Sequence, residues 1–181
     1  MQFLPGHIYH VYNQGNNKIR IFFDTENYLF FLRKMRKNLT PYCFILSWCL
    51  MPNHFHWLIK VKLPTETHES VSIQNQTTPV TQLNRNIGTL LSSYTQSINT
   101  KYGRNGSLFR KRTKAKALVP DNNQNNYALN CFLYIHQNPL RARLVRRLED
   151  WQFSSFQDFS GIRSGSLCDI ELAKDILHLP E

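Results

Sequence analysis

Two apolar segments joined by a short turn constrain the fold of this chain most. YCFILSWCL (42–50) is an almost continuous apolar run of the kind that forms a central strand. HFHWLIKV (54–61) follows directly after the turn MPN and is rich in β-branched and aromatic residues. The sequence therefore predicts a β-hairpin over residues 42–61.

Two histidines share one face of the second segment. A strand directs successive side chains to opposite faces, so His54 and His56 lie together, away from Phe55, Trp57 and Ile59. If the apolar face packs in the core, both imidazoles point to the other side of the sheet. Two histidines at this spacing can share one divalent cation, but they hold it weakly without a third ligand. The alternative is an exposed strand face with two unrelated histidines.

The order of the predicted elements indicates the fold class. Strand and helix patterns alternate along the chain as β-α-β-β-α-β, followed by one more helix. This order predicts an α+β fold of the ferredoxin-like type, in which both helices of the repeat cover one face of an antiparallel sheet. The additional helix is then free to cover the other face. The predicted strands are 7–14, 42–50, 54–61 and 114–119, and the predicted helices are 25–39, 80–103 and 125–138, the last of them ended by Pro139.

Length and composition fit a single folded domain. The chain has 181 residues, and a hydrophobic fraction of 41% is enough to form a core. We expect one domain over 1–181, with a core at about 7–147, a polar insertion at about 62–80 and a C-terminal tail at about 148–181. No apolar run approaches the roughly 20 residues that span a bilayer, and the N-terminus lacks the pattern of a secretory signal. We therefore expect a cytoplasmic protein without a membrane partner.

The charge balance favours a polyanionic partner. Lys and Arg number 22 against 12 Asp and Glu, which gives a formal net charge of +10. Many of the basic residues fall in two clusters, 101–116 and 141–147, and the first also contains aromatic residues. Such clusters suit contacts to a nucleic-acid backbone and stacking on bases. A solvated basic surface is the alternative.

The helix predicted over 125–138 supplies further polar groups. Tyr134 and Asn138 are four residues apart and therefore neighbours on one helical face. Asn138 offers a hard oxygen ligand, and Tyr134 offers a hydroxyl that can act as a nucleophile or a hydrogen-bond donor. A core aromatic residue and an ordinary helix end are the alternatives. His136 lies about 160° around the helix from Asn138, so we expect it outside the same site.

Four sequence blocks resemble, in order, those of REP-associated tyrosine transposases, which belong to the single-tyrosine HUH endonuclease transposases. The blocks are MPNHFHWLIK (51–60), GSLFRKRTKAKALV (106–119), YIHQNPLRARLV (134–145) and DWQFSSFQDF (150–159). The segment YHVYNQGNNKIRIFFD (9–24) also resembles the N-terminal strand and loop of that family. The resemblance extends over roughly residues 7–160. It departs from the family at Gln14, where Arg is frequent, and at Arg143, where Gly is common.

The resemblance implies a metal-dependent endonuclease and strand transferase that acts on single-stranded DNA near hairpins through a 5′-phosphotyrosine intermediate. His54 and His56 match the metal-binding pair, Asn138 matches the third ligand, and Tyr134, on the additional helix, matches the catalytic tyrosine. The implied metal is Mg²⁺ or Mn²⁺. A non-catalytic, domesticated DNA-hairpin-binding protein is the alternative function.

The implied partner is single-stranded DNA carrying a hairpin, such as a REP-like sequence or an insertion-sequence end. Both a monomer and a homodimer are compatible with the sequence. Basic side chains of the two clusters, together with residues of the loop after the first strand, are expected to contact the DNA. The expected DNA-binding residues are Asn16, Asn17, Lys18, Arg20, Arg104, Arg110, Arg112, Lys114, Lys116, Arg141 and Arg143.

Overall fold

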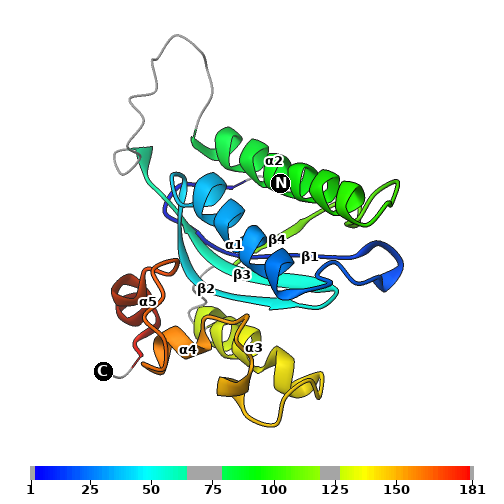
Figure 1. The fold of residues 1–181 in the computed structure, drawn as a ribbon. Helices are drawn as coiled ribbons and strands as arrows, with labels where there is room; N and C mark the ends of the chain where they lie inside the picture. The colour runs from blue at the N-terminus through cyan, green and yellow to red at the C-terminus, as the bar shows by residue number, and fades with distance from the viewer. Residues whose placement is uncertain (1–2, 65–78, 119–126, 180–181) are drawn as a thin grey trace.

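A computed structural model describes residues 3–64, 79–118 and 127–179, and it places helices on both faces of a four-stranded sheet (Figure 1). The strands pair antiparallel in the order β2-β3-β1-β4. They are β1 (Ile8–Gln14), β2 (Cys43–Met51), β3 (His54–Val61) and β4 (Lys114–Ala117). The helices are α1 (Thr25–Leu39), α2 (Pro79–Lys101), α3 (Tyr127–Arg141), α4 (Phe156–Phe159) and α5 (Ile170–Leu177). The predicted hairpin is confirmed as the pair β2 and β3.

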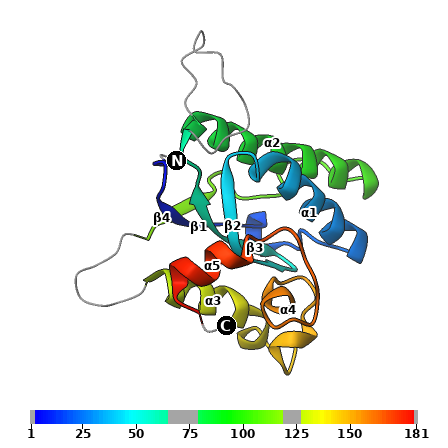
Figure 2. The same ribbon diagram turned by 90° about the vertical axis from the view of Figure 1, so that its left-hand side faces the viewer.

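Helices α1 and α2 cover one face of the sheet (Figure 2). The Asp24 carboxylate accepts a hydrogen bond from the Asn27 amide at 2.8 Å and caps the start of α1. The apolar face of α1 then packs Phe31 against the inward side chains of β3. Those side chains are Phe55, Trp57 and Ile59, so the predicted division of this strand into two faces is confirmed.

The opposite face of the sheet is covered by α3 and α5 (Figure 2). Phe132 and Ile135 of α3 pack with Leu46 of β2 and Leu58 of β3 in a second apolar cluster. The apolar run of β2 is explained by this arrangement, because the strand is buried from both sides. Helix α3 thus lies over the face that carries the two histidines.

Helix α3 does not end at Pro139, which corrects the sequence-based prediction. Pro139 lies inside the helix, which continues to Arg141. A proline removes one helical N–H donor, but the residues after it still bond backwards, as the Ala142 amide does to the Asn138 carbonyl at 2.9 Å. The turn of the chain comes instead at Arg143, whose φ is 55°.

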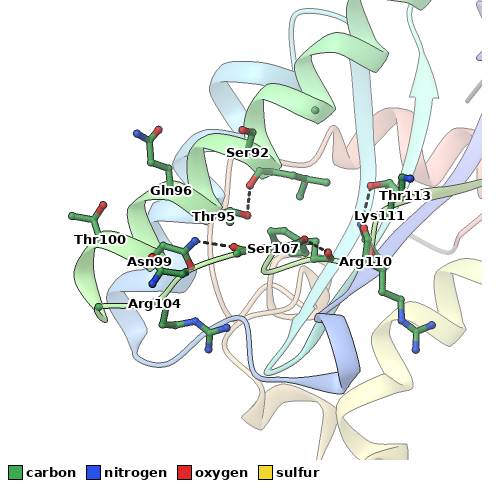
Figure 3. Close-up of a pocket in the computed structure, with 17 residues that line it drawn as sticks. Ser92, Thr95, Gln96, Asn99, Thr100, Arg104, Ser107, Arg110, Lys111 and Thr113 are labelled. Carbon is green, nitrogen blue, oxygen red and sulfur yellow. Dashed lines mark hydrogen bonds between the residues drawn. The ribbon is translucent and has the colours of Figure 1, made fainter.

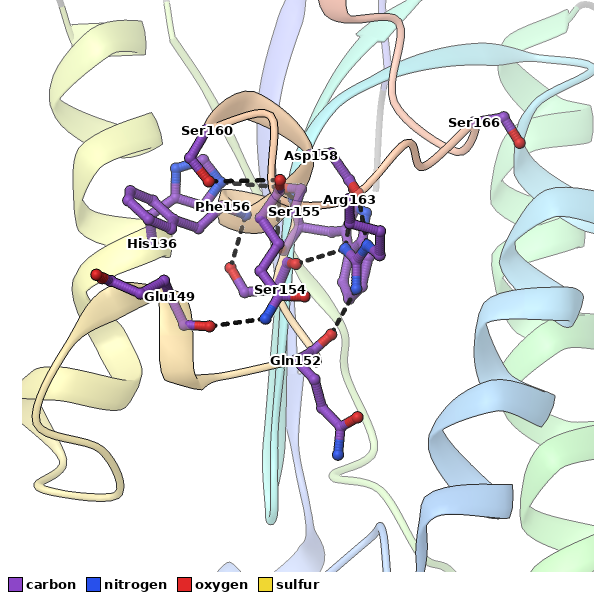
Figure 4. Close-up of polar contacts among 12 residues, drawn as sticks. His136, Glu149, Gln152, Ser154, Ser155, Phe156, Asp158, Ser160, Arg163 and Ser166 are labelled. Carbon is purple, nitrogen blue, oxygen red and sulfur yellow. Dashed lines mark hydrogen bonds and ion pairs between the residues drawn. The ribbon is translucent and has the colours of Figure 1, made fainter.

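The segment after α3 returns to the outer edge of β2 (Figure 4). The Leu50 amide donates to the Phe153 carbonyl, and the Ser155 amide donates to the Trp48 carbonyl, each at 2.9 Å. The buried Asp158 carboxylate pairs with Arg163, whose guanidinium also donates to the Ser154 carbonyl. These contacts join the tail to the sheet that supports α3.

Some predicted segments lie outside the described residues. They are residues 65–78 of the predicted polar insertion (62–80), residue 119 of the fourth predicted strand, and residues 125–126 of the third predicted helix. Among the helices described, none combines the length and apolar character needed to cross a membrane.

Candidate functional site

A pocket of about 270 Å³ lies where β1 and β3 meet α3 and the segment before β4. His54 and His56 enter it from β3, and their pairing partners on β1, Gln14 and Tyr12, lie beside them. Tyr134 enters from α3. The structure therefore brings together six residues that the sequence singled out: His54, His56, Arg110, Arg112, Lys114 and Tyr134.

Each of the two histidines has a polar partner at its Nδ1 atom. His54 Nδ1 lies 2.7 Å from Asn53 Oδ1, and His56 Nδ1 lies 2.9 Å from Nε2 of His10. An amide oxygen only accepts hydrogen bonds, so His54 carries its proton on Nδ1 and keeps a lone pair on Nε2. A histidine held at one ring nitrogen in this way is oriented to bind a metal with the other.

Burial keeps these imidazoles neutral. Burial lowers the pKa of His56 to about 3, and the neighbouring histidines act in the same direction. It also lowers the pKa of His10 to about 4, with a smaller contribution from the charge of Lys116, and it lowers the pKa of His54. The neutral imidazole is the form that ligates a metal, so this pair suits a divalent cation.

A third protein ligand to a metal at this histidine pair would have to be of another kind. Among the described residues, no group of three or more His, Cys, Asp or Glu side chains is placed to hold a metal ion. Asn138 is 9% exposed, and its Nδ2 donates to the Tyr134 carbonyl at 2.8 Å. This bond uses the amide nitrogen and orients the carboxamide, but Asn138 is not among the residues that line the pocket.

The Tyr134 ring lies among the imidazoles. Its centroid is 5.4 Å from that of His56 and 6.1 Å from that of His10, and the side chain is 37% exposed. The guanidinium carbon of Arg141 lies 5.7 Å from the same centroid, which places a positive charge at the ring face. The Tyr134 side chain is therefore partly exposed to solvent, and its ring lies close to His56.

The other residues that are expected to bind DNA do not line the pocket. Asn16, Asn17 and Lys18 form an exposed turn after β1, and the Lys18 carbonyl accepts a bond from Asn53, next to His54. The exposed Arg20 follows that turn. Lys116 of β4 lies opposite His10 of β1 in the pairing of these two strands. Neither Arg104 nor the exposed Arg143 lines this pocket.

Sequence reasoning missed Tyr12, and for His10 it allowed both a place on the face of His54 and a structural role. The Tyr12 ring is 5.8 Å from His56 and 4.8 Å from His10, so it forms part of the same cluster. Both residues have the strand parity that places them with the histidines of β3. That parity is readable in the sequence, but the register between β1 and β3 is not. The prediction for His136 is confirmed, because it lies outside the pocket and contacts Ser155.

The arrangement of strands and helices defines the fold class of this chain. This is a mixed α/β fold with a four-stranded antiparallel sheet, consistent with the fold of tyrosine transposases. The structure is similar to that of a REP-associated tyrosine transposase bound to a REP hairpin, with a TM-score of 0.58 and 16% sequence identity. The similarity covers 94% of this chain and 92% of that one. No family model and no curated protein matches the sequence. At this identity, the similarity establishes a shared fold.

Proposed function

We propose that this chain is a metal-dependent, single-stranded DNA endonuclease and strand transferase that acts near DNA hairpins. The observation that carries the proposal is the position of Tyr134, a partly exposed tyrosine whose ring lies beside His56 in a pocket that also holds His54 and basic side chains. The proposal includes a ferredoxin-like topology for the sheet and a single domain over residues 1–181. The similarity to a hairpin-bound transposase supports the choice of DNA hairpins as substrate.

His54 and His56 would hold the metal, with Asn138 as the third protein ligand. Nε2 of His54 is available because Nδ1 donates to Asn53, and His56 is available at Nε2 when Nδ1 donates to His10. Mg²⁺ or Mn²⁺, when bound, would polarise the scissile phosphate and offset the charge that develops on its oxygens. His10 and Asn53 act in this proposal as positioning residues that fix the orientation of the imidazoles.

Tyr134 supplies the nucleophile. Its hydroxyl oxygen attacks phosphorus, the bond from phosphorus to the 3′ oxygen breaks, and the phenolic proton is lost as the 3′ hydroxyl forms. The product is a 5′-phosphotyrosyl link, which a second 3′ hydroxyl can reverse to join a new strand. Arg110, Arg112 and Lys114 line the same pocket and would neutralise the neighbouring phosphates.

A covalent adduct assay tests this proposal. Purified protein is incubated with Mn²⁺ and single-stranded DNA containing hairpins from the flanks of its gene, and adducts are resolved by denaturing electrophoresis. We expect a protein–DNA adduct that Tyr134→Phe abolishes. Tyr127→Phe is the matched control, because Tyr127 is an exposed tyrosine on the same helix that does not line the pocket. Absence of nicking and adduct across a broad hairpin panel contradicts the proposal.

Non-catalytic hairpin binding is the second candidate. It is favoured by one observation, namely that Asn138 does not line the pocket that contains the two histidines. The two functions differ in their dependence on His54. Hairpin binding that survives His54→Ala, together with no cleavage by the wild-type protein, would identify the binding function.

A further inference from the structure

A second, larger cavity lies on the other side of the segment that precedes β4 (Figure 3). This groove of about 990 Å³ runs between the C-terminal half of α2 and residues 103–113. Helix α2 contributes hydroxyl and amide side chains, including Ser92, Gln96 and Asn99. The facing segment contributes Arg104, Arg110 and Lys111, and none of the described Asp or Glu residues lines the groove. Its surface is therefore positively charged and mixes polar groups with apolar ones such as Leu91 and Phe109.

The groove and the catalytic pocket share a wall. Asn13 and Arg110 line both cavities. Beyond Arg110, side chains of the extended segment alternate: Lys111 and Thr113 line the groove, whereas Arg112 and Lys114 line the pocket. β4 is an edge strand, and among the described residues no further strand lies beyond it. Basic side chains of the segment before β4 and of its first residue therefore face the groove and the pocket in turn around this edge.

Two polar atoms at the groove have no partner within the described residues. Asn99 Oδ1 and Arg104 Nε are buried and accept or donate no hydrogen bond there. Buried polar atoms are normally satisfied, so these two leave the wall of the groove incompletely hydrogen-bonded. An open groove with cationic, hydroxyl and amide groups fits phosphates and base edges better than an apolar small molecule.

We propose that the groove binds a segment of single-stranded DNA that continues around the β4 edge into the pocket at Tyr134. This inference rests on the proposed function, and it adds a second binding site for the strand that is cut. Backbone phosphates contact the basic wall formed by Arg110 and Lys111, and the bases face the polar side chains of α2. Lysines that merely protect an exposed sheet edge from pairing are the alternative explanation of this basic segment.

Gly88 provides a test that leaves the catalytic pocket untouched. It lines the groove on α2, and a side chain added there meets open space. Replacement of a helical glycine also favours the helix, so the variants are expected to fold. Binding of a labelled random-sequence 20-mer of single-stranded DNA is measured by fluorescence anisotropy in the Tyr134→Phe background. Gly88→Glu, Gly88→Gln and Gly88→Lys are compared with Thr89→Glu, an exposed α2 residue outside the groove.

We expect Gly88→Glu to raise Kd about fivefold or more, Gly88→Lys to lower it, and Gly88→Gln and Thr89→Glu to change it less than twofold. Equal effects of Gly88→Glu and Thr89→Glu, or no effect of either, overturn the proposal. So does an RNA 20-mer that competes better than the DNA. The adduct assay separates the two proposals. If the wild-type protein forms an adduct but Gly88→Glu leaves Kd unchanged, only the proposal of DNA binding in the groove is overturned. If Gly88→Glu raises Kd but no adduct forms, only the proposed catalysis is overturned.

Discussion

Arg143 adopts a backbone conformation that favours glycine. Its φ is 55°, and it follows the last turn of α3. The Arg143 amide donates to the Leu140 carbonyl at 2.9 Å, and the Leu144 amide donates to the Pro139 carbonyl at 3.0 Å. This pair of bonds is a Schellman motif, which is usually built with glycine at the left-handed position. An arginine at this position therefore lowers the stability of the protein.

We predict that Arg143→Gly stabilises the protein by about 1 kcal/mol, because glycine relieves the left-handed strain. Arg143→Ala removes the same charge but keeps a Cβ atom, so it should give no such gain. Urea unfolding with unchanged m-values measures the difference between the two variants. Equal stabilities of the Gly and Ala variants contradict the prediction. DNA binding should fall equally in both, because Arg143 is expected to contact DNA through its charge.

The orientation of helix α3 depends on a buried contact two residues after Tyr134. His136 is 3% exposed, and its Nε2 lies 2.8 Å from the hydroxyl of the fully buried Ser155 (Figure 4). Ser155 also accepts a bond from the Trp48 amide of β2 at 2.9 Å. Helix, tail and sheet therefore meet at one hydroxyl, which fixes the side of α3 opposite to the pocket.

We predict that Ser155→Ala destabilises the protein by about 1–3 kcal/mol, because it leaves a buried imidazole nitrogen and a buried amide without their partner. His136→Phe keeps an aromatic ring in the apolar surroundings. In the double variant, the imidazole nitrogen is no longer left unpaired, so the two costs should not add. Urea unfolding of the two single variants and the double variant measures a coupling of about 1 kcal/mol. Additive costs would show that His136 and Ser155 act independently.

At the scale of elements, the local periodicity of the sequence predicted which faces of the strands and helices are buried, but not how the strands pair. The alternation in 54–61 correctly assigned the two faces of β3, because one face had to be buried. The hydrophobic pattern also located α3. The prediction that the helix ends at Pro139 was wrong, because a proline in the last turns of a helix removes only one hydrogen-bond donor. The contact between His10 and His56 joins two strands distant in the sequence, and no single segment encodes that register.

The candidate site was partly predictable for the same reason. His54, His56 and Tyr134 were found because each carries a reactive group at a regular spacing within one element. Tyr12 was missed because its importance depends on its neighbour across β1 and β3. Asn138 was predicted as a ligand from helical spacing alone, and it stays a prediction. Spacing fixes which residues share a face, but not which of them reaches the pocket.

At the scale of the molecule, basic side chains occur on both sides of the sheet, and they differ in whether they line the pocket at Tyr134. Arg112 and Lys114 enter the pocket at Tyr134 from the β4 edge. Arg33 and Lys37 are exposed on α1, which packs on the other face of the sheet. The two pairs contribute equally to the net charge of the protein. A DNA strand held along the β4 edge distinguishes them, because only close phosphate contacts release bound counterions.

We therefore predict that Arg112→Gln/Lys114→Gln changes the salt dependence of single-stranded DNA binding, whereas Arg33→Gln/Lys37→Gln does not. Each lost phosphate contact reduces the slope of log K against log salt concentration by about 0.7, so the first double variant should lose about 1.4. Both variants remove two positive charges, so a general effect of net charge would alter their slopes alike. Anisotropy titrations between 50 and 200 mM salt, about the range over which such slopes are resolved, measure the difference. Equal slopes for the two variants would mean that the strand does not follow the β4 edge.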